Sequence, residues 1–343
     1  MTAVQATAVT LWLGLTAYAV FGGADFGGGF WDLAAGGTER GALPRALIAD
    51  AIGPVWEANH TWLIFDLVIL WTAFSPAFAA IMSTLFVPLS LAAFGIVLRG
   101  AAFAFRPVAA GSRARRAAGA VFAVSSVVTP FFLGAAGGAI ASGRVPAGNA
   151  AGDPWGSWLN PTSALVGLLA IATCAYLAAV FLVAEARRRS QPALAGYFLR
   201  RATVAAIVAG ALALAGIVVL RADAPGLADE LTRRGWPFIV ASGVFGTAAL
   251  LRLRLAAPRG TRVLAVGAVV AVIWGWGVAQ YPYILPGAMT LDDAAAPAGA
   301  LEGLLVVFVV AAVLIAPSLA LLYSLAQRSR LVAHGLGSDQ ADH

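Results

Sequence analysis

Long apolar segments recur along this chain, and they restrict its fold more than any other feature. Each contains about 20 or more residues, the length that an α-helix needs to cross a bilayer. Of the 343 residues, 61% are hydrophobic and 11% are charged, whereas a soluble domain carries about 25% charged residues. We therefore predict an all-α polytopic membrane helix bundle. The expected spans, about nine, are residues 6–30, 56–74, 78–105, 118–141, 162–185, 202–220, 237–255, 263–283 and 301–325.

Arginine in the connecting loops predicts the orientation of the bundle. Seventeen arginines fall in one set of alternate loops and the C-terminal tail, and only Arg144, Arg221, Arg233 and Arg234 fall in the other set. Because Lys and Arg accumulate on the cytoplasmic side, the N-terminus is expected outside and the C-terminus in the cytoplasm. We expect one transmembrane domain over residues 1–330 and a polar tail over residues 331–343. The N-terminus lacks the basic region of a secretory signal.

One apolar segment opens with an unusual group of polar residues. The stretch GPVWEANHTW at positions 53–62 places Glu57, Asn59 and His60 within four residues. Asp25 lies in a glycine-rich stretch of the first span, and Arg99 lies near the same end of the third. Ionisable groups at membrane depth are costly unless paired or solvated, so they indicate function. We expect Asp25 and Glu57 to approach one another with Arg99 balancing their charge; alternatively, all three are only interfacial.

Asp66 lies nine residues after Glu57, about 13 Å deeper and on the opposite face of the same helix. It is expected to face a second polar interior or another subunit, or else to be a neutral carboxylic acid bonded to a neighbouring helix. His60 is the only histidine outside the tail, and it is interpreted as a hydrogen-bonded or relay group rather than a metal ligand. The chain shows no His/Cys metal spacing and no convincing pair of haem ligands. The formal charge of +6 is spread over loops, so no nucleic-acid partner is expected.

Four motifs in order carry a resemblance to a known family. They are GGADFGGG at 22–29, IGPVWEANHTW at 52–62, LRGAAFAFR at 98–106 and YPYILP at 281–286. On these residues the chain resembles subunit II of cytochrome bd quinol oxidase. The resemblance spans most of the chain and is strongest before residue 110. Asp25, Trp56, Glu57 and Arg99 fall on the family's polar positions. The chain departs from the family at Glu57-Ala58, where aspartate-glycine is common, at His60 and Asp66, and in a short segment after Pro286.

The resemblance implies a haem-free subunit II of a quinol:O₂ oxidoreductase in the bacterial cytoplasmic membrane. Haems b and d are expected in the partner, subunit I, and none in this chain, which is itself not catalytic. Some members hold a structural quinone or lipid, and a small single-helix subunit is a further partner. The expected role is to scaffold subunit I and to conduct cytoplasmic protons through Asp25, Glu57, Asn59, His60 and Asp66, with Trp56 and Arg99 in structural or charge-balancing roles. The alternatives are a stand-alone proton-coupled transporter and a purely structural partner subunit.

Overall fold

The computed structural model describes residues 1–343 except 38, 106–110, 256–259, 315–316, 319–320 and 322–343. The side chains of residues 52–58 and 112 also lie outside the description, and so does the expected tail at 331–343. The assigned helices are α1 (Ala3–Leu33), α2 (Ala42–Ala73), α3 (Ser75–Thr84), α4 (Phe86–Phe105), α5 (Gly111–Ala141), α6 (Pro161–Arg188), α7 (Pro192–Asp223), α8 (Pro225–Arg233), α9 (Trp236–Arg254), α10 (Thr261–Gln280) and α11 (Leu291–Ala294). A two-stranded antiparallel sheet joins β1 (Tyr283–Leu285) to β2 (Met289–Thr290).

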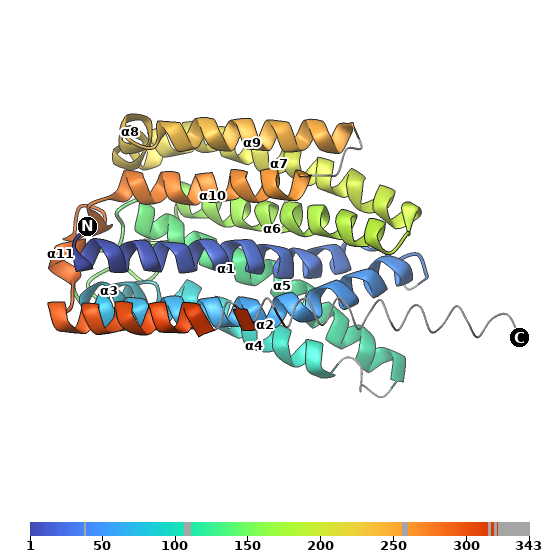
Figure 1. The fold of residues 1–343 in the computed structure, drawn as a ribbon, viewed down its shortest axis with the longest axis horizontal. Helices are drawn as coiled ribbons and strands as arrows, with labels where there is room; N and C mark the ends of the chain where they lie inside the picture. The colour runs from blue at the N-terminus through green and yellow to red at the C-terminus, as the bar shows by residue number, and fades with distance from the viewer. Residues whose placement is uncertain (38, 106–110, 256–259, 315–316, 319–320, 322–343) are drawn as a thin grey trace, which may run out of the picture.

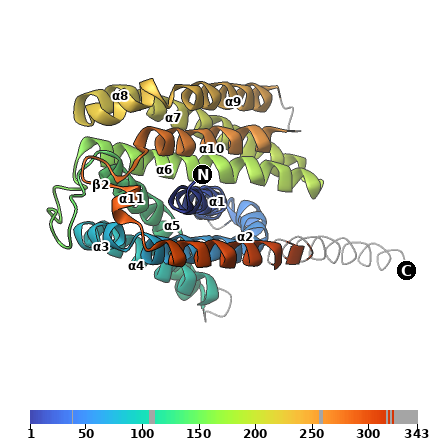
Figure 2. The same cartoon turned by 60° about the vertical axis from the view of Figure 1, so that its left-hand side comes forward.

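The long helices lie side by side and run up and down between two ends of the molecule (Figure 1). One end holds the N-terminus, α3, α8 and α11. Helix α1 packs against α2, α5, α6 and α10, so it lies inside the bundle, as the view turned by 60° also shows (Figure 2). Pairs α6–α7 and α9–α10 extend the bundle on one side of α1, and α4–α5 extends it on the other.

The helix boundaries follow from local sequence. Proline stands in the first turn of α3, α6, α7, α8 and α9, where its missing N–H has no helical partner to lose. The Asn160 side chain accepts a hydrogen bond from the Ser163 amide at the start of α6, and Thr2 forms a capping box with Gln5 at the start of α1. These caps satisfy N–H groups that the helix itself leaves open.

The described residues include seven helices that are long and apolar enough to cross a membrane. An eighth candidate is the bent pair Asn59–Ala73 and Ser75–Thr84, whose axes differ by 118°, and a shorter apolar helix covers Ala298–Leu314. The prediction of an all-α polytopic bundle is therefore confirmed. The expected single span at 78–105 is wrong: the chain breaks at Leu85, so that α3 and α4 are separate helices.

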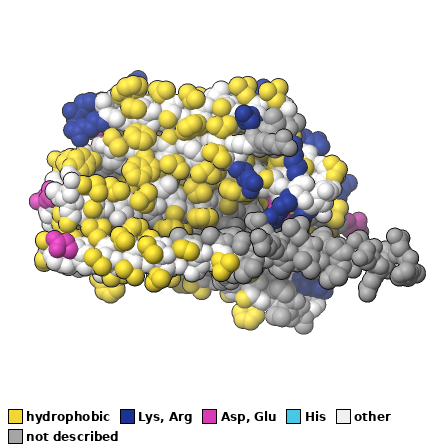
Figure 3. Space-filling view, in the orientation of Figure 1, with side chains coloured by type: hydrophobic (Ala, Val, Ile, Leu, Met, Phe, Trp, Pro, Cys, Tyr) yellow, Lys and Arg dark blue, Asp and Glu magenta, His cyan; other side chains and the backbone are white. Residues whose placement is uncertain are grey.

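Apolar side chains cover the face of the bundle seen in Figure 3, and the charged side chains gather toward its two ends. Large exposed hydrophobic residues such as Phe94, Val218 and Val244 lie on the outer surfaces of α4, α7 and α9. A soluble protein rarely exposes apolar area on this scale. The surface is that of a protein surrounded by lipid.

Candidate functional site

The polar residues at membrane depth meet where α1, α2, α4 and α5 converge. The glycine-rich stretch of α1 makes this approach possible. A Cβ atom on Gly22 would lie 2.9 Å from the Asn59 Oδ1 atom, and a Cβ on Gly29 would overlap the Ser126 side chain of α5. On another face, a Cβ on Gly27 would overlap the Cys174 carbonyl of α6. Small residues therefore allow three neighbouring helices to reach the α1 backbone.

Asp25 and Arg99 form an ion pair at the centre of this convergence. Arg99 Nη1 donates to Asp25 Oδ2 and Nη2 donates to Asp25 Oδ1, both at 2.7 Å. Nη2 also donates to the Asp25 backbone carbonyl at 3.0 Å. The Asp25 and Arg99 side chains are 0% and 1% exposed. The bidentate geometry is the strongest form of a guanidinium–carboxylate contact.

The remaining surroundings of Arg99 also suit its charge. Its Nε donates to Ser126 Oγ at 2.8 Å, and that hydroxyl in turn donates to the Phe122 carbonyl at 2.6 Å. The rings of Phe26 and Phe122 lie 5.0 and 4.7 Å from the guanidinium carbon, within cation–π range. A buried charge is tolerated only when it is paired and hydrogen-bonded. Arg99 meets both conditions, so the pair ties α1, α4 and α5 together.

Asn59 connects α2 to this pair. Its Nδ2 donates to Asp25 Oδ2 at 3.3 Å, and its side chain is 1% exposed. Its Oδ1 is buried and has no hydrogen-bond partner among the described residues. Because an unsatisfied buried acceptor is destabilising, this oxygen is a natural place for a water molecule or a protonated group.

A second polar position lies farther along the contact between α1 and α2. Asp66 is half-buried on α2 and packs against Gly14 of α1, whose Cβ would overlap the Asp66 carboxylate. Its Oδ1 is buried with no hydrogen-bond partner in the described part of the chain. Asp66 lies seven residues after Asn59, which places both on one face of α2 about 10 Å apart. Asp66 thus packs against a helix of its own chain, and its expected role stays a prediction.

Tyr18 lies between these two positions on α1. Its hydroxyl is fully buried, has no hydrogen-bond partner among the described residues and feels the charges of both Asp25 and Asp66.

Sequence reasoning missed Tyr18 and Ser126. The signal for Tyr18 was its spacing of seven residues from Asp25, which is two helical turns and therefore the same face. The signal for Ser126 was a pair of serines in an otherwise apolar segment.

The structure describes only some of the other predicted site residues. The side chains of Trp56 and Glu57 lie outside the described residues, so the expected approach of Glu57 to Asp25 stays a prediction. His60 is half-buried on α2, directly after Asn59. No group of three or more His, Cys, Asp or Glu residues that could hold a metal occurs among the described residues. The side-chain groups that donate to Asp25 are the Arg99 guanidinium and the Asn59 amide.

Comparisons with known proteins agree with this architecture. The family model described as cytochrome bd terminal oxidase subunit II matches residues 4–326. The chain is 30% identical over 112 residues to cytochrome bd ubiquinol oxidase subunit 2 of Bacillus subtilis (strain 168). That match covers 33% of this chain and only 32% of the length of that relative.

A solved structure resembles the chain over almost its whole length. It is a chain of the bd oxidase from Geobacillus thermodenitrificans, with a TM-score of 0.75 and 25% sequence identity. The similarity covers 95% of this chain and 98% of that chain. Since the family model also extends from residue 4 to residue 326, the chain belongs to the family of cytochrome bd terminal oxidase subunit II.

Proposed function

We propose that this chain is the haem-free subunit II of a bd-type quinol:O₂ oxidoreductase in the bacterial cytoplasmic membrane. In this proposal it scaffolds a haem-bearing subunit I and gives protons a route from the cytoplasm toward the site of O₂ reduction. The near-complete family match supports the assignment to the complex. In this complex the haems b and d are held by the partner, where they supply the redox chemistry, and a small subunit and a structural quinone or lipid are its further components.

One observation carries the proton route: three buried polar oxygens that have no hydrogen-bond partner in the described part of the chain lie along the contact between α1 and α2. They are Asn59 Oδ1, the Tyr18 hydroxyl and Asp66 Oδ1. The two outer positions, Asn59 and Asp66, are about 10 Å apart along α2 with Tyr18 between them, so bridging water would complete the path. Such oxygens offer water the polar partners that it needs inside a protein.

The Asp25–Arg99 pair has a different role in this proposal. Both oxygens of Asp25 accept hydrogen bonds from Arg99, so the Asp25 carboxylate is engaged as the counter-ion of Arg99. It also positions Asn59. The mobile protons are carried by Glu57, two residues before Asn59, with His60 assisting, and by Asp66 deeper in the bundle. Arg99 sets the charge balance.

The test is O₂ consumption by the complex purified with Glu57→Gln in this chain. Glutamine keeps the size of the side chain and removes the exchangeable proton, so turnover with quinol should fall at least about tenfold while haem content per complex is unchanged. Tyr18→Phe and Asp66→Asn should slow turnover in the same way. The exposed acid Glu302 provides the control Glu302→Gln, for which turnover should stay normal.

The same variants separate the remaining candidates. If Glu57→Gln assembles and turns over at the wild-type rate, the chain provides no proton route through Glu57. If it prevents subunit I from co-purifying, the polar residues act as a structural partner surface. The sharply bent α2–α3 pair is a feature that broken helices of transporters also have. A colourless chain that purifies alone and moves protons into liposomes would favour that alternative.

A further inference from the structure

Polar residues recur at multiples of seven positions along the two helices that carry the proposed proton route. Seven residues are about two helical turns, so residues spaced in this way lie close to one face of a helix. The residues are Tyr18, Asp25 and Asp32 on α1 and Arg45, Asn59 and Asp66 on α2. Hydrogen bonds join Asp32 to Arg45 and Asp25 to Asn59 across the contact between these faces. We call this contact the polar seam.

The seam reaches a surface with polar residues at one end only. Toward the end that holds the N-terminus, the next positions of the same spacing are Leu11 and Val4 on α1 and Ala73 on α2, and all three belong to an apolar cluster. Toward the opposite end, the spacing continues to Asp32 in the last turn of α1 and to Arg45 near the start of α2. The polar end of the seam is therefore the arginine-rich end, which is predicted to face the cytoplasm.

Asp32 and Arg45 form an ion pair at this end of the seam. Arg45 Nε donates to Asp32 Oδ1 at 2.8 Å, and the side chains of Asp32 and Arg45 are 5% and 24% exposed. The Arg45 guanidinium also donates to the backbone carbonyls of Gly36 and Gly37, in the turn that follows α1. A buried carboxylate thus lies next to a side chain that solvent reaches and that the turn holds in place.

Helix α1 places no side chain between Asp32 and Asp25 on this face. Positions 28 and 29 lie three and four residues from each of the two acids, so they share the face with them, and both are glycine. At Gly29 the neighbour is the Ser126 hydroxyl of α5, which an added Cβ would overlap. The two acids are about 10 Å apart along the helix, and α1 contributes no apolar side chain that would keep water out of this interval.

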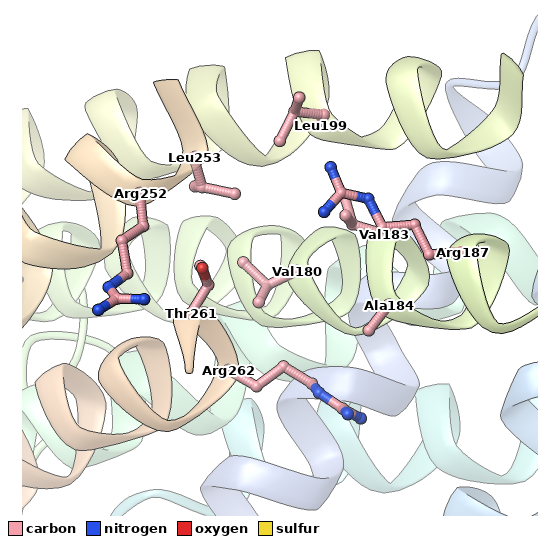
Figure 4. A pocket seen from close by; sticks show the side chains of 9 residues that line it. All are labelled: Val180, Val183, Ala184, Arg187, Leu199, Arg252, Leu253, Thr261 and Arg262. Atoms are coloured by element: carbon pink, nitrogen blue, oxygen red, sulfur yellow. The ribbon is translucent and has the colours of Figure 1, made fainter. Parts of the chain in front are cut away.

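Another opening in the bundle is a less suitable entry for protons. It is a small pocket between α6, α7, α9 and α10, and Figure 4 shows the arginine and apolar side chains that line it. Its volume of about 10 Å³ is about the space for one water molecule. The described residues that line it include no carboxylate and none from α1 or α2. This pocket therefore provides neither a proton-binding group nor a contact with the polar seam.

We propose that Asp32 is the residue through which cytoplasmic protons enter the polar seam, an inference that rests on the proposed proton route. A proton from cytoplasmic water binds to the Asp32 carboxylate, moves on to water beside Gly28 and Gly29, and leaves Asp32 ionised again. Each transfer thus restores the starting state of the residue. The protons are consumed where the partner subunit reduces O₂. Arg45 holds the carboxylate at the end of the seam between transfers.

The test is O₂ consumption by the purified complex with Asp32→Asn in this chain. Asparagine keeps the shape of the side chain and removes the group that binds the proton, so turnover should fall at least about tenfold at unchanged haem content. The ratio of turnover in H₂O to turnover in D₂O should rise, because proton delivery becomes the slowest step. Asp32→Glu keeps a carboxylate and should restore most of the turnover.

A second aspartate–arginine pair near the same end of α2 provides the matched control. Asp50 Oδ2 lies 2.6 Å from Arg189 Nη1, and the Asp50 side chain is 57% exposed. Asp50 follows Arg45 by five residues, which places it about 140° around α2 from the seam. Asp50→Asn should therefore leave turnover and the isotope ratio normal. Equal losses in Asp50→Asn and Asp32→Asn would overturn the assignment to Asp32.

The double variant Asp32→Asn/Arg45→Gln separates proton entry from a purely structural ion pair. It removes both charges, so neither is left buried without its partner. If Asp32 takes up protons, turnover stays as low as in Asp32→Asn. Recovery of turnover, or loss of the haem-bearing subunit from both variants, would show a structural pair and overturn the proposal.

The failure of this inference differs from the failure of the proton route itself. If Asp32→Asn turns over at the wild-type rate while Glu57→Gln is slow, the chain conducts protons but they do not enter at Asp32. Wild-type rates in both variants would contradict the route as well as the entry.

Discussion

At the scale of single residues, the unusual feature is a charged pair that is almost completely buried and joined by several hydrogen bonds. Arg99 uses Nε, Nη1 and Nη2 for four hydrogen bonds to Asp25 and Ser126. Removing one partner of such a pair leaves the other as an isolated buried charge, whereas removing both leaves none. Removing one of the two residues is therefore expected to cost more stability than removing both.

We expect Arg99→Met to destabilise the folded chain by about 3–5 kcal/mol, because Asp25 then lacks its counter-ion. The double variant Asp25→Leu/Arg99→Met should recover a large part of this loss. The measurement is the free energy of unfolding in detergent, compared around the double-mutant cycle. The pair Arg144–Asp223, with side chains 28% and 16% exposed, is a natural comparison, and Arg144→Met should cost less. A double variant no more stable than Arg99→Met would contradict the explanation.

At the scale of elements, α1 depends on glycine where other helices press against it. Gly27 faces the α6 backbone at Cys174 and the Ala178 side chain, while Gly210 of α7 has nothing within 4 Å of an added Cβ. The two positions carry the same residue in helices of similar length. They differ in burial and in how close the neighbouring helix lies.

Gly27→Ala should destabilise the chain by about 1–3 kcal/mol or more, because the methyl group forces α1 and α6 apart. Gly210→Ala should be neutral or slightly stabilising, since alanine favours the helix and meets no neighbour. Thermal unfolding of the two purified variants against wild type measures the difference. Equal effects of the two substitutions would mean that contact with α6 is not the reason for glycine at position 27.

Most of the long helices could be predicted from the sequence, because the length of an apolar segment can be read directly from neighbouring residues. The depth of Asp25 and Arg99 followed from counting residues in two helices, and their contact was then a reasonable expectation. The break at Leu85 was not predicted, because the apolar run continues through it and the cause lies in how α3 packs across the end of the bundle. Ser126 and Tyr18 were missed because their importance depends on which helices become neighbours.

At the scale of the whole molecule, the helix ends divide the charges unequally between the two ends of the bundle. The connections after α1, α4, α6 and α9 and the helix ends beside them contain 15 of the 22 arginines, and the loop at residues 142–160 lies at the opposite end of the bundle (Figure 1). The positive-inside tendency predicts that the arginine-rich end faces the cytoplasm. This orientation also decides from which side protons would reach Asn59.

Cysteine labelling measures the orientation directly. Cys174 is the single native cysteine and is buried, so its background labelling should be low. Asn149→Cys and Gln191→Cys place a thiol at exposed positions in the 142–160 loop and between α6 and α7. A membrane-impermeant maleimide should label position 149 in intact spheroplasts and position 191 only in inverted vesicles. The reverse pattern would place the N-terminus in the cytoplasm and would contradict the proposed entry of cytoplasmic protons at the arginine-rich end.

The wide separation of Asp25 and Arg99 in sequence has a consequence for how the protein is made. Arg99 follows Asp25 by 74 residues, so at about 5–20 residues per second the ribosome needs roughly 4–15 s to supply the counter-ion. During that interval α1 has already left the ribosomal exit tunnel. Asp25 still lacks its counter-ion, and α5 and α6 do not yet cover the glycine-rich face of α1. The polar and glycine-lined faces of α1 therefore gain their partners only from helices that are synthesised after it.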